Sequence, residues 1–266
     1  AAAVFYAIWK SMTGTPWKVG VDPLVLDLDG DGLELIAQTN ASPSFDFDGD
    51  NFAELSGWVR PDDGFLVRDL DGDGVITSTG EMFGGAGVEG FAALSVMDAN
   101  NDGMVSALDA GFGDLLLWRD LDGDAMTDQG ELSTLAASGV ISIGLASAED
   151  GRFVANNIVA RTGSFTRSDG STGEAGSVVF TLDQSQTTYL GGADPSAAAL
   201  ALPELKGYGD LPSLRVAMTE HASLLALAEA IVPTLVTNDL AALNAASKPL
   251  LAAWVGLVGM VAAMIP

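Results

Sequence analysis

The sequence contains no cysteine, a single histidine and few basic residues. Without cysteine the chain has no disulfide, no thiol nucleophile and no zinc–thiolate centre, a composition that fits a secreted bacterial protein. The lone histidine, His221, stands beside Glu220 in an Ala/Leu-rich stretch, far in sequence from any Ser-rich motif. No glycine-rich phosphate loop with a lysine is present. These absences disfavour a histidine-based hydrolase and a nucleotide-binding enzyme.

Positive charge is scarce throughout the acidic part of the chain. The 266 residues carry 36 Asp and Glu against 11 Lys and Arg, a net charge of −25, and 25 of the acidic residues lie between Asp22 and Glu131 with only three arginines. Such a density repels nucleic acid and anionic membranes, and it opposes folding unless cations neutralise it. Divalent cations are therefore the expected partners. A glycosidase-type carboxylate pair stays open as an alternative, although nearly every acidic residue here falls in a metal-type loop.

Changes in composition divide the chain into three parts. Residues 1–22 form the end of an upstream region, so that the sequence reads as a piece of a longer protein. Residues 23–192 alternate short β-type runs with Asp/Gly clusters. Residues 193–266 are rich in Ala and Leu and predict a helical downstream segment. The predicted fold class is α+β, with the β-rich module placed before the helices.

Periodicity predicts individual elements within these parts. We expect helices over 89–97, 107–119 and 131–138, a strand over 140–146, and a β-meander over 152–190. In the downstream segment the last helix is expected to begin after Pro249. Its apolar run, 250–265, is short for a bilayer and contains two glycines, so a buried helix is favoured over a membrane-bound or chaperone-bound segment.

Two consecutive twelve-residue segments have the ligand spacing of an EF-hand calcium loop, with oxygens from positions 1, 3, 5, 7, 9 and 12. These positions hold Asp98, Asn100, Asp102, Met104, Ser106 and Asp109 in the first segment, and Asp120, Asp122, Asp124, Met126, Asp128 and Glu131 in the second. Asp109 reaches less far than the usual Glu. Ala125 replaces the turn glycine and predicts a strained left-handed backbone. The sequence predicts calcium at both loops; the alternative is a pair of Asp-rich turns that cap helices.

Three earlier clusters have the carboxylates of positions 1, 3 and 5 but lack an acidic residue at position 12. They are Asp27/Asp29/Asp31, Asp46/Asp48/Asp50 and Asp69/Asp71/Asp73. Glu34, Glu54 and Glu81 stand nearby and complete these sites with altered spacing in our interpretation, with solvated β-turns as the alternative. A further glycine-rich stretch, residues 84–92, matches a single copy of the RTX nonapeptide. A β-roll needs stacked copies, so this stretch is predicted to be only a connection.

The ordered motifs resemble a known family. VDPLVLDLDGDGLELI, FDFDGDNFAELSGWV, DDGFLVRDLDGDGVI, GEMFG, LLLWRDLDGDAMTDQGEL and GSFTRSDGSTG together resemble the self-processing module of FrpC-like, iron-regulated RTX proteins, over about residues 22–190. The resemblance implies a secreted or cell-surface location by type I secretion. It also implies that calcium-induced folding triggers cleavage of an Asp-Pro bond, here Asp22–Pro23, and that the new C-terminal Asp can form an isopeptide bond with a Lys-bearing acceptor protein. By motif, the family's calcium carboxylates correspond to Asp98, Asp109 and Asp120.

The implied cleavage is chemically reasonable for these two residues. The Asp22 carboxylate can attack its own main-chain carbonyl, close a five-membered anhydride and expel the Pro23 nitrogen, in a single-turnover autoprocessing reaction. A second Asp-Pro dipeptide, Asp194–Pro195, means that the dipeptide alone is uninformative. The position of Asp22–Pro23 just before the first DLDGDG cluster carries the prediction. The alternative is a structural calcium module of a secreted adhesin or toxin that cuts nothing.

Overall fold

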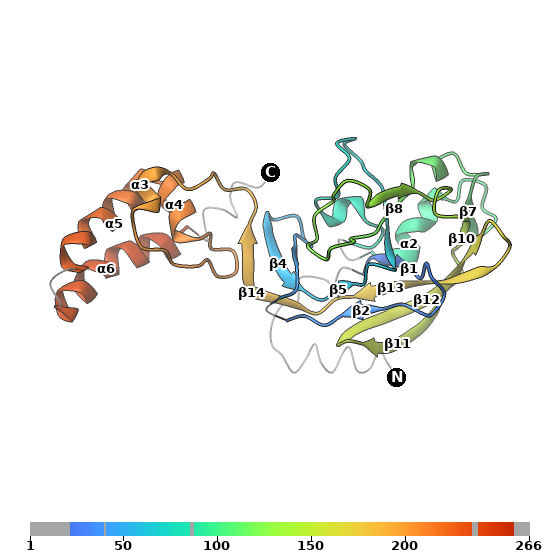
Figure 1. The fold of residues 1–266 in the computed structure, drawn as a ribbon, viewed down its shortest axis with the longest axis horizontal. Coiled ribbons are helices and arrows are strands. Elements are labelled where there is room, and N and C mark those ends of the chain that lie inside the picture. The colour runs from blue at the N-terminus through green and yellow to red at the C-terminus, as the bar shows by residue number, and fades with distance from the viewer. Residues whose placement is uncertain (1–21, 40, 86–87, 236–238, 258–266) are drawn as a thin grey trace. The chain divides into compact units, whose positions relative to one another are not determined.

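The computed structural model describes residues 22–39, 41–85, 88–235 and 239–257 (Figure 1). These residues form two compact units. The first comprises 22–49 and 55–182 and is built mainly of strands. The second comprises 50–54 and 183–257 and is mainly helical. Strands dominate the first unit and helices the second, an arrangement consistent with the α+β class.

The first unit is organised by one antiparallel sheet, in the order β7-β10-β12-β13-β1-β6-β8-β9, with β11 beside β12. Its strands are β1 (Leu24–Leu26), β6 (Gly64–Val67), β7 (Met104–Ser106), β8 (Leu116–Trp118), β9 (Leu132–Thr134), β10 (Val140–Gly144), β11 (Ala148–Val154), β12 (Asn157–Arg167) and β13 (Thr172–Val179). Short elements fill the connections: β2 (Leu35–Ile36) paired with β5 (Trp58–Val59), β3 (Ser44–Phe45), the 3-10 turns η1 (Thr79–Glu81), η2 (Ser95–Met97) and η3 (Phe112–Asp114), and helix α2 (Gly90–Leu94).

Hydrophobic side chains pack against both sides of strand β1. Val25 belongs to one hydrophobic cluster, which includes Trp58 and Trp118, while Leu24 and Leu26 belong to the cluster on the other face. All three β1 residues are fully buried. A three-residue apolar run without alternation is what a strand with two covered faces needs. The chain immediately before β1, residues 22 and 23, is therefore attached to a fully buried strand of the unit.

The sequence-predicted elements of the first unit are partly confirmed. The helix near 89–97 is present as α2 and η2, the strand over 140–146 as β10, and the β-meander in part, as the consecutively paired strands β11, β12 and β13. The last strand of the predicted meander, β14 (Leu182–Tyr189), pairs with β4 (Phe52–Ser56) instead of β13. The helices predicted over 107–119 and 131–138 are wrong. Gly111 and Gly113 weaken the first of them, and Leu115, Leu117 and Trp118 are buried in the sheet, where β8 pairs with β6 and β9.

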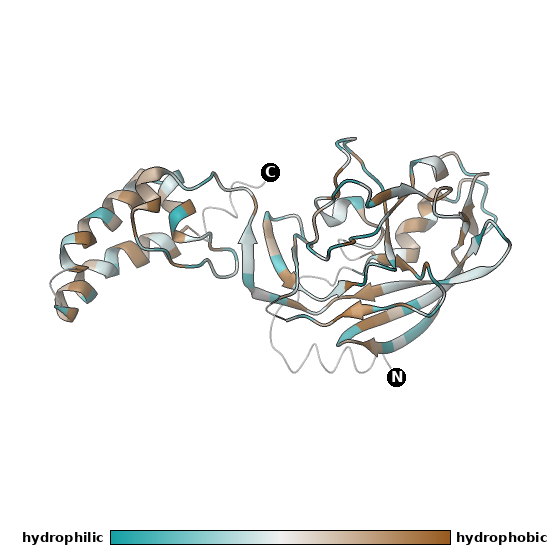
Figure 2. Ribbon diagram, in the orientation of Figure 1, coloured by the Kyte–Doolittle hydropathy of each residue, from teal (hydrophilic) through white to brown (hydrophobic). Residues whose placement is uncertain are grey.

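The second unit consists of β14 (Leu182–Tyr189), which pairs with β4 (Phe52–Ser56), followed by α3 (Ala197–Leu200), α4 (Leu214–Glu220), α5 (Ala222–Leu235) and α6 (Leu240–Val255). Its helices pack around their own apolar cluster, which includes Leu214, Leu224 and Trp254. Figure 2 shows brown, hydrophobic residues distributed along these helices. Between residues 197 and 255 the described part of the chain thus contains four helices, α3 to α6.

The start of the last helix is not where Pro249 predicts it. Helix α6 begins after Asp239, whose side chain accepts hydrogen bonds from the amides of Ala241 and Ala242, and Pro249 lies inside the helix. The N-cap, rather than the proline, sets the boundary. The end of the predicted apolar run, 258–265, lies outside the described residues. Among the helices that the structure describes, none has both the length and the apolarity for a bilayer crossing.

Candidate metal centres and the Asp22–Pro23 bond

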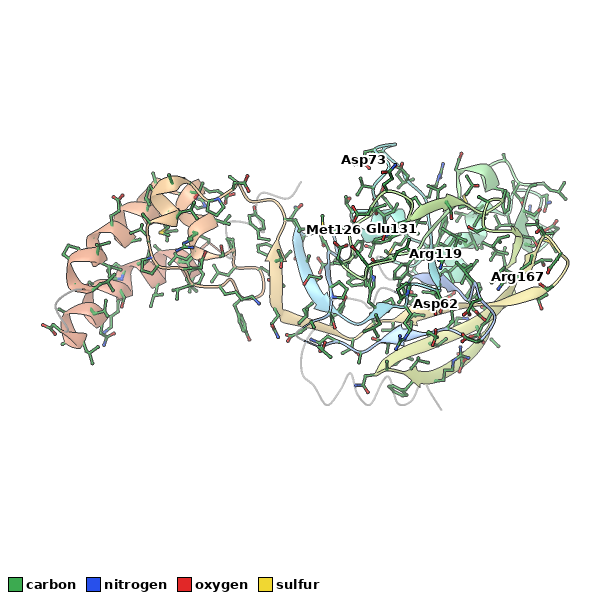
Figure 3. All side chains as sticks on the ribbon, in the orientation of Figure 1. Asp62, Asp73, Arg119, Met126, Glu131 and Arg167 are labelled. Carbon is green, nitrogen blue, oxygen red and sulfur yellow. The ribbon has the colours of Figure 1, made fainter. Side chains whose placement is uncertain are left out.

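Acidic side chains of the described residues converge in five groups of three, with carboxylate oxygens within 4.8 Å of one another. The groups are Asp27/Asp29/Asp63, Asp46/Asp48/Asp50, Asp69/Asp71/Asp73, Asp120/Asp122/Glu131 and Asp122/Asp124/Asp128. Asp73 and Glu131, labelled in Figure 3, mark two of the loops concerned. Four of the five predicted loops thus bring three carboxylates together. Oxygen-only donor sets of this kind suit hard divalent cations.

The loop over 120–131 has the closed geometry that its spacing predicts. The Asp120 carboxylate accepts hydrogen bonds from the amides of Gly123 (2.7 Å) and Ala125 (2.8 Å). The Glu131 carboxylate returns to the loop and accepts from the amides of Leu121 (2.7 Å) and Asp128 (2.9 Å). Ala125 has a φ of 60°, the left-handed conformation expected at the turn position. Both end carboxylates are consequently fixed by main-chain donors.

The same loop is bonded directly to the aromatic core. Trp58 donates its indole N–H to Asp120 Oδ2 (2.6 Å), and Trp118 donates to Glu131 Oε2 (3.4 Å). The two indole rings lie 5.7 Å apart by their centroids. Partial desolvation, together with repulsion from Asp124 and the other loop carboxylates, raises the pKa of the Asp122 carboxyl. A cation bound here would relieve that repulsion, at carboxylates that contact two buried tryptophans.

Glu81 closes the loop that starts at Asp69 in the manner of Glu131. It accepts hydrogen bonds from the amides of Leu70 (3.3 Å) and Thr77 (3.0 Å), while Asp69 accepts from Gly72 (2.7 Å) and Gly74 (3.0 Å). This loop is one residue longer than an EF-hand loop, which is why its twelfth position, Gly80, carries no ligand. Glu81 is bonded to the main chain of this loop, but its carboxylate is not in the converging group of Asp69, Asp71 and Asp73, so its role as a metal ligand stays a prediction.

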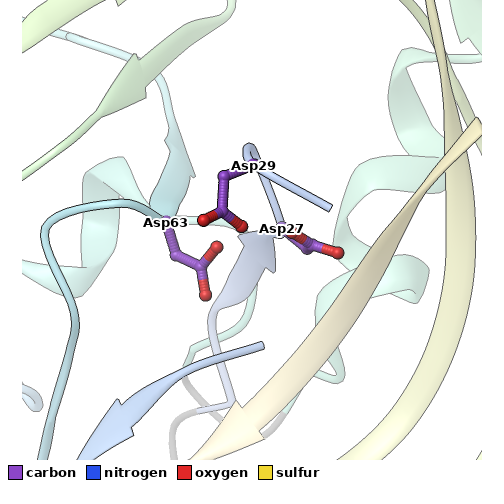
Figure 4. A group of neighbouring side chains, drawn as sticks. All are labelled: Asp27, Asp29 and Asp63. Atoms are coloured by element: carbon purple, nitrogen blue, oxygen red, sulfur yellow. The ribbon is translucent and has the colours of Figure 1, made fainter. Parts of the chain in front are cut away.

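The first loop is closed by a residue that the sequence analysis missed. Asp63 comes from the turn before β6 and accepts hydrogen bonds from the amides of Leu28 (3.3 Å) and Glu34 (2.7 Å). Its side chain points towards Asp29 and Asp27 in Figure 4. Asp63 is 1% exposed, and this burial raises its pKa to about 7. The acidic PDDG turn, residues 61–64, could have indicated this residue. The EF-hand spacing considers only ligands within twelve consecutive residues, so it does not include Asp63.

Two residues predicted for the first loop take other places. The Glu34 side chain faces Asp62, and the hydrogen bond between the two carboxyls is the main cause that raises the pKa of Glu34. Asp31 is not in the converging group. Its contact with the Asp29 carboxyl raises its own pKa. The acidic cluster is thus wider than one twelve-residue loop.

The loop over 98–109 has the main-chain pattern without a converging triad. Asp109 accepts hydrogen bonds from the amides of Ala99 and Ser106, both at 2.9 Å, and Asp98 accepts from Asp102 (3.1 Å) and Gly103 (3.0 Å). The Ser106 amide is the main cause that lowers the pKa of Asp109. The carboxylates of this loop, those of Asp98, Asp102 and Asp109, are not among the converging groups of the described residues. Calcium at this loop stays a prediction.

The Asp22–Pro23 bond is anchored by the strand that follows it. Pro23 is buried, and its carbonyl accepts a hydrogen bond from the Val178 amide of β13 (3.0 Å). The next residue, Leu24, donates its amide to the carbonyl of Phe83 (2.9 Å). The Asp22 carbonyl group lies against the main chain of Gly84 and Gly90. The bond predicted to be cut is therefore held by a folded environment on its C-terminal side.

The Asp22 carboxyl is placed for acid–base chemistry near neutral pH. Burial, followed by repulsion from Glu89, raises its pKa from the ordinary 3.8 to about 7. Glu89 is itself fixed, because its carboxylate caps α2 by accepting the amides of Phe91 (3.0 Å) and Ala92 (3.1 Å). The sequence analysis missed Glu89 and both glycines, which belong to the stretch predicted to be only a connection.

Comparison with known proteins agrees with the family suggested by the motifs. Residues 24–181 match the SPM domain family. The chain is 36% identical over 206 residues to the iron-regulated protein FrpA of Neisseria meningitidis serogroup C, and this alignment covers 74% of the chain. It spans only 18% of the length of that relative. On the strength of the family match over more than half of its residues, the chain belongs to the SPM domain family.

Proposed function

We propose that the first unit is a calcium-dependent self-processing module that cuts its own chain between Asp22 and Pro23. The observation that carries this proposal is the environment of the bond. A carboxyl with a pKa of about 7 sits on the residue whose carbonyl is packed against the fold, and the leaving residue is fixed to β13. Near pH 7 such a carboxyl is ionised in a substantial fraction of molecules, as a nucleophile must be.

The reaction needs no external nucleophile for its first step. A carboxylate oxygen of Asp22 forms a bond to the main-chain carbonyl carbon of Asp22, and the C–N bond to Pro23 breaks. The proline nitrogen takes up a proton from water and leaves as a secondary amine, and Asp22 becomes a five-membered cyclic anhydride. Proline favours this step because the nitrogen of its tertiary amide is more easily twisted and protonated. Holding the reacting atoms in place can supply about 7–11 kcal/mol of the barrier.

The anhydride then has two fates. Addition of water regenerates the Asp22 carboxyl as a free C-terminal acid. Addition of a lysine amine from an acceptor protein forms an amide bond to Asp22 and leaves the other carboxyl free. The first route gives hydrolysis and the second gives ligation. In either case the chain from Pro23 onward is released with a new N-terminus.

The converging carboxylates are the residues that would hold calcium. Calcium accepts six to eight oxygen ligands in irregular geometry, whereas magnesium demands near-ideal octahedra and retains its waters. Loops with carboxylates at alternate positions and a closing acid fit the first requirement. When bound, calcium supplies the positive charge that lets the acidic segment fold. Secretion of the chain into a calcium-rich medium is part of the same proposal.

The test is intact-mass spectrometry of this chain in chelator and after addition of millimolar calcium. We expect two products, one ending at Asp22 and one beginning at Pro23, formed only with calcium. Hydroxylamine in the same reaction should convert part of the first product into a hydroxamate, because it intercepts the anhydride. Calcium-induced folding without any cut would favour the alternative, a structural calcium module of a secreted adhesin or toxin.

A further inference from the structure

We propose that Gly84 and Gly90 are positioning residues that form a slot for the carbonyl group of Asp22, an inference that rests on the cleavage proposed above. Neither glycine belongs to a metal loop, and neither has a chemical group of its own. Because they have no side chain, the main chain at Gly84 and Gly90 can lie directly against the carbonyl group of the bond to be cut. We call residues 81–85 and 88–90 the slot segment.

The contacts are specific to the reacting carbonyl. A side chain at Gly84 would overlap both the carbonyl carbon and the carbonyl oxygen of Asp22, at distances that real side chains do not show. A Cβ at Gly90 would stand 2.9 Å from the same oxygen and 2.8 Å from the Leu24 side chain. Gly84 also has a φ of 121°, which L-residues rarely adopt. Two glycines six residues apart therefore meet one carbonyl group.

The slot segment is fixed at both ends. On the Gly84 side, Met82 pairs with Val67 of β6, and the Phe83 carbonyl accepts the amide of Leu24. On the Gly90 side, helix α2 buries Phe91 in the core of the first unit and is capped by Glu89. Residues beside the two glycines are thus anchored to the sheet and to the core, next to the place where the Asp22 carbonyl group lies.

Such a slot helps the reaction by fixing the orientation of the attacked carbon. The carboxylate carbon and the carbonyl carbon of Asp22 are separated by two atoms, Cβ and Cα, and closing the five-membered ring requires particular rotations about the bonds between them. A carbonyl held against the slot keeps the opposite face of its carbon open to the side-chain oxygen. A displacement of about 1 Å in such an arrangement costs about a hundredfold in rate. A methyl group at Gly84 forces a displacement of this order, because it overlaps both carbonyl atoms of Asp22, whereas one at Gly90, 2.9 Å from the carbonyl oxygen, forces a smaller one.

The test compares Gly84→Ala and Gly90→Ala with Gly113→Ala. Gly113 is exposed in η3, and a Cβ there meets nothing within 4 Å. The rate of cleavage after calcium addition is followed by intact mass, and the calcium midpoint of folding by tryptophan fluorescence. The ratio in which water and hydroxylamine capture the Asp22 anhydride is measured in the same samples. A second readout is the ¹³C resonance of the residue 22 carbonyl in the uncut Asp22→Asn background.

We expect both slot variants to cut at least about tenfold more slowly, in line with a misplaced reacting group. Their calcium midpoints and their hydroxylamine partition should stay unchanged, the carbonyl resonance should move, and Gly113→Ala should match the unsubstituted chain. Equal cleavage rates in all variants overturn the slot but leave the proposed function intact. Slower cleavage with a weakened calcium midpoint also overturns it, since a general structural role then suffices. If the unsubstituted chain is never cut, the proposed function fails, and the slot fails with it.

Discussion

The chain contains two Asp-Pro bonds whose surroundings differ. Asp22–Pro23 is half-buried against the first unit, ahead of the fully buried strand β1. Asp194 is exposed in the second unit, in an irregular stretch before α3, whose N-cap is Ser196. Burial and Glu89 raise the pKa of the Asp22 carboxyl to about 7. The covalent structure of the two dipeptides is identical, so any difference in reactivity must come from the fold around them.

This comparison separates the reactive groups that every Asp-Pro dipeptide contains from the properties that the surrounding fold adds. An Asp-Pro bond supplies a nucleophile, an electrophile and a good leaving group wherever it occurs. It does not supply a fixed carbonyl, a carboxyl that titrates near neutrality or a reason to respond to calcium. The surroundings of Asp22 supply these three properties in our proposal. The experiments below remove them in turn.

The largest effect is expected from the nucleophile itself. Asp22→Ala should abolish calcium-triggered cleavage, because no side-chain oxygen remains to attack the carbonyl carbon. Asp22→Glu should be cut far more slowly, since a six-membered ring with an extra rotatable bond fits the same slot poorly. Intact mass over a time course in calcium measures both.

Asp194→Ala is the matched control and should be cut at the rate of the unsubstituted chain. Cleavage that persists in Asp22→Ala, or that falls equally at both Asp-Pro bonds, would mean ordinary proteolysis or acid lability. That result would return the chain to the structural alternative.

Metal removal should erase the difference between the two bonds. In excess chelator the repulsion among 25 acidic residues between Asp22 and Glu131 is uncompensated, and the module should lose its fixed tertiary packing. Near-UV circular dichroism should then collapse, and neither bond should be cut at neutral pH. The helices of the second unit carry their own apolar cluster, so their far-UV signal should survive. An unchanged near-UV spectrum in chelator contradicts calcium-coupled folding.

Much of this module was predictable from sequence, for a definite reason. Carboxylates at positions 1, 3, 5 and 12 mark a loop because the ligands are neighbours along the chain. The hydrogen-bonded 120–131 loop and its left-handed Ala125 follow from that rule, whereas Glu81 stands one residue beyond it. Asp63 does not, because it reaches the first loop from the distant turn before β6. Local spacing holds no information on which distant turn supplies a missing ligand.

The two wrong helices and the slot have a related cause. The run over 115–118 has helical spacing, but its burial between β6 and β9 is decided by tertiary pairing. The glycines of the slot segment indicate only a permissive backbone until the fold shows what lies against them. In both cases the sequence contains the residue type and the tertiary structure supplies the neighbour.

A smaller, graded effect is expected from the metal loops. Asp120→Asn replaces the carboxylate whose Oδ2 accepts the Trp58 indole N–H with a neutral amide. We expect it to weaken calcium binding by about tenfold to a hundredfold, the range found when an interaction with a charged group is lost. Asp98→Asn alters a loop without a converging triad and should act more weakly. Calcium titration by tryptophan fluorescence measures both midpoints, and cleavage at subsaturating calcium should follow the same order. Equal midpoints for the two variants would contradict the ranking.

The smallest effect concerns pH and Glu89. The protonated Asp22 carboxyl is not a nucleophile, so at saturating calcium the cleavage rate should fall as the pH drops below about 7 and level off above it. Glu89→Gln removes one cause of the raised pKa while its amide oxygen can still cap α2. Burial, the larger cause, remains, so the inflection should move below 7 without reaching the ordinary 3.8. The variant should therefore cut faster than the unsubstituted chain at pH 6 and equally fast at pH 8.

Glu149→Gln, at an exposed position of β11, is the matched control and should leave the pH profile of cleavage unchanged. An unaltered profile in Glu89→Gln would show that the charge of Glu89 does not act on the bond, and would leave burial as the whole of the difference between Asp22 and Asp194.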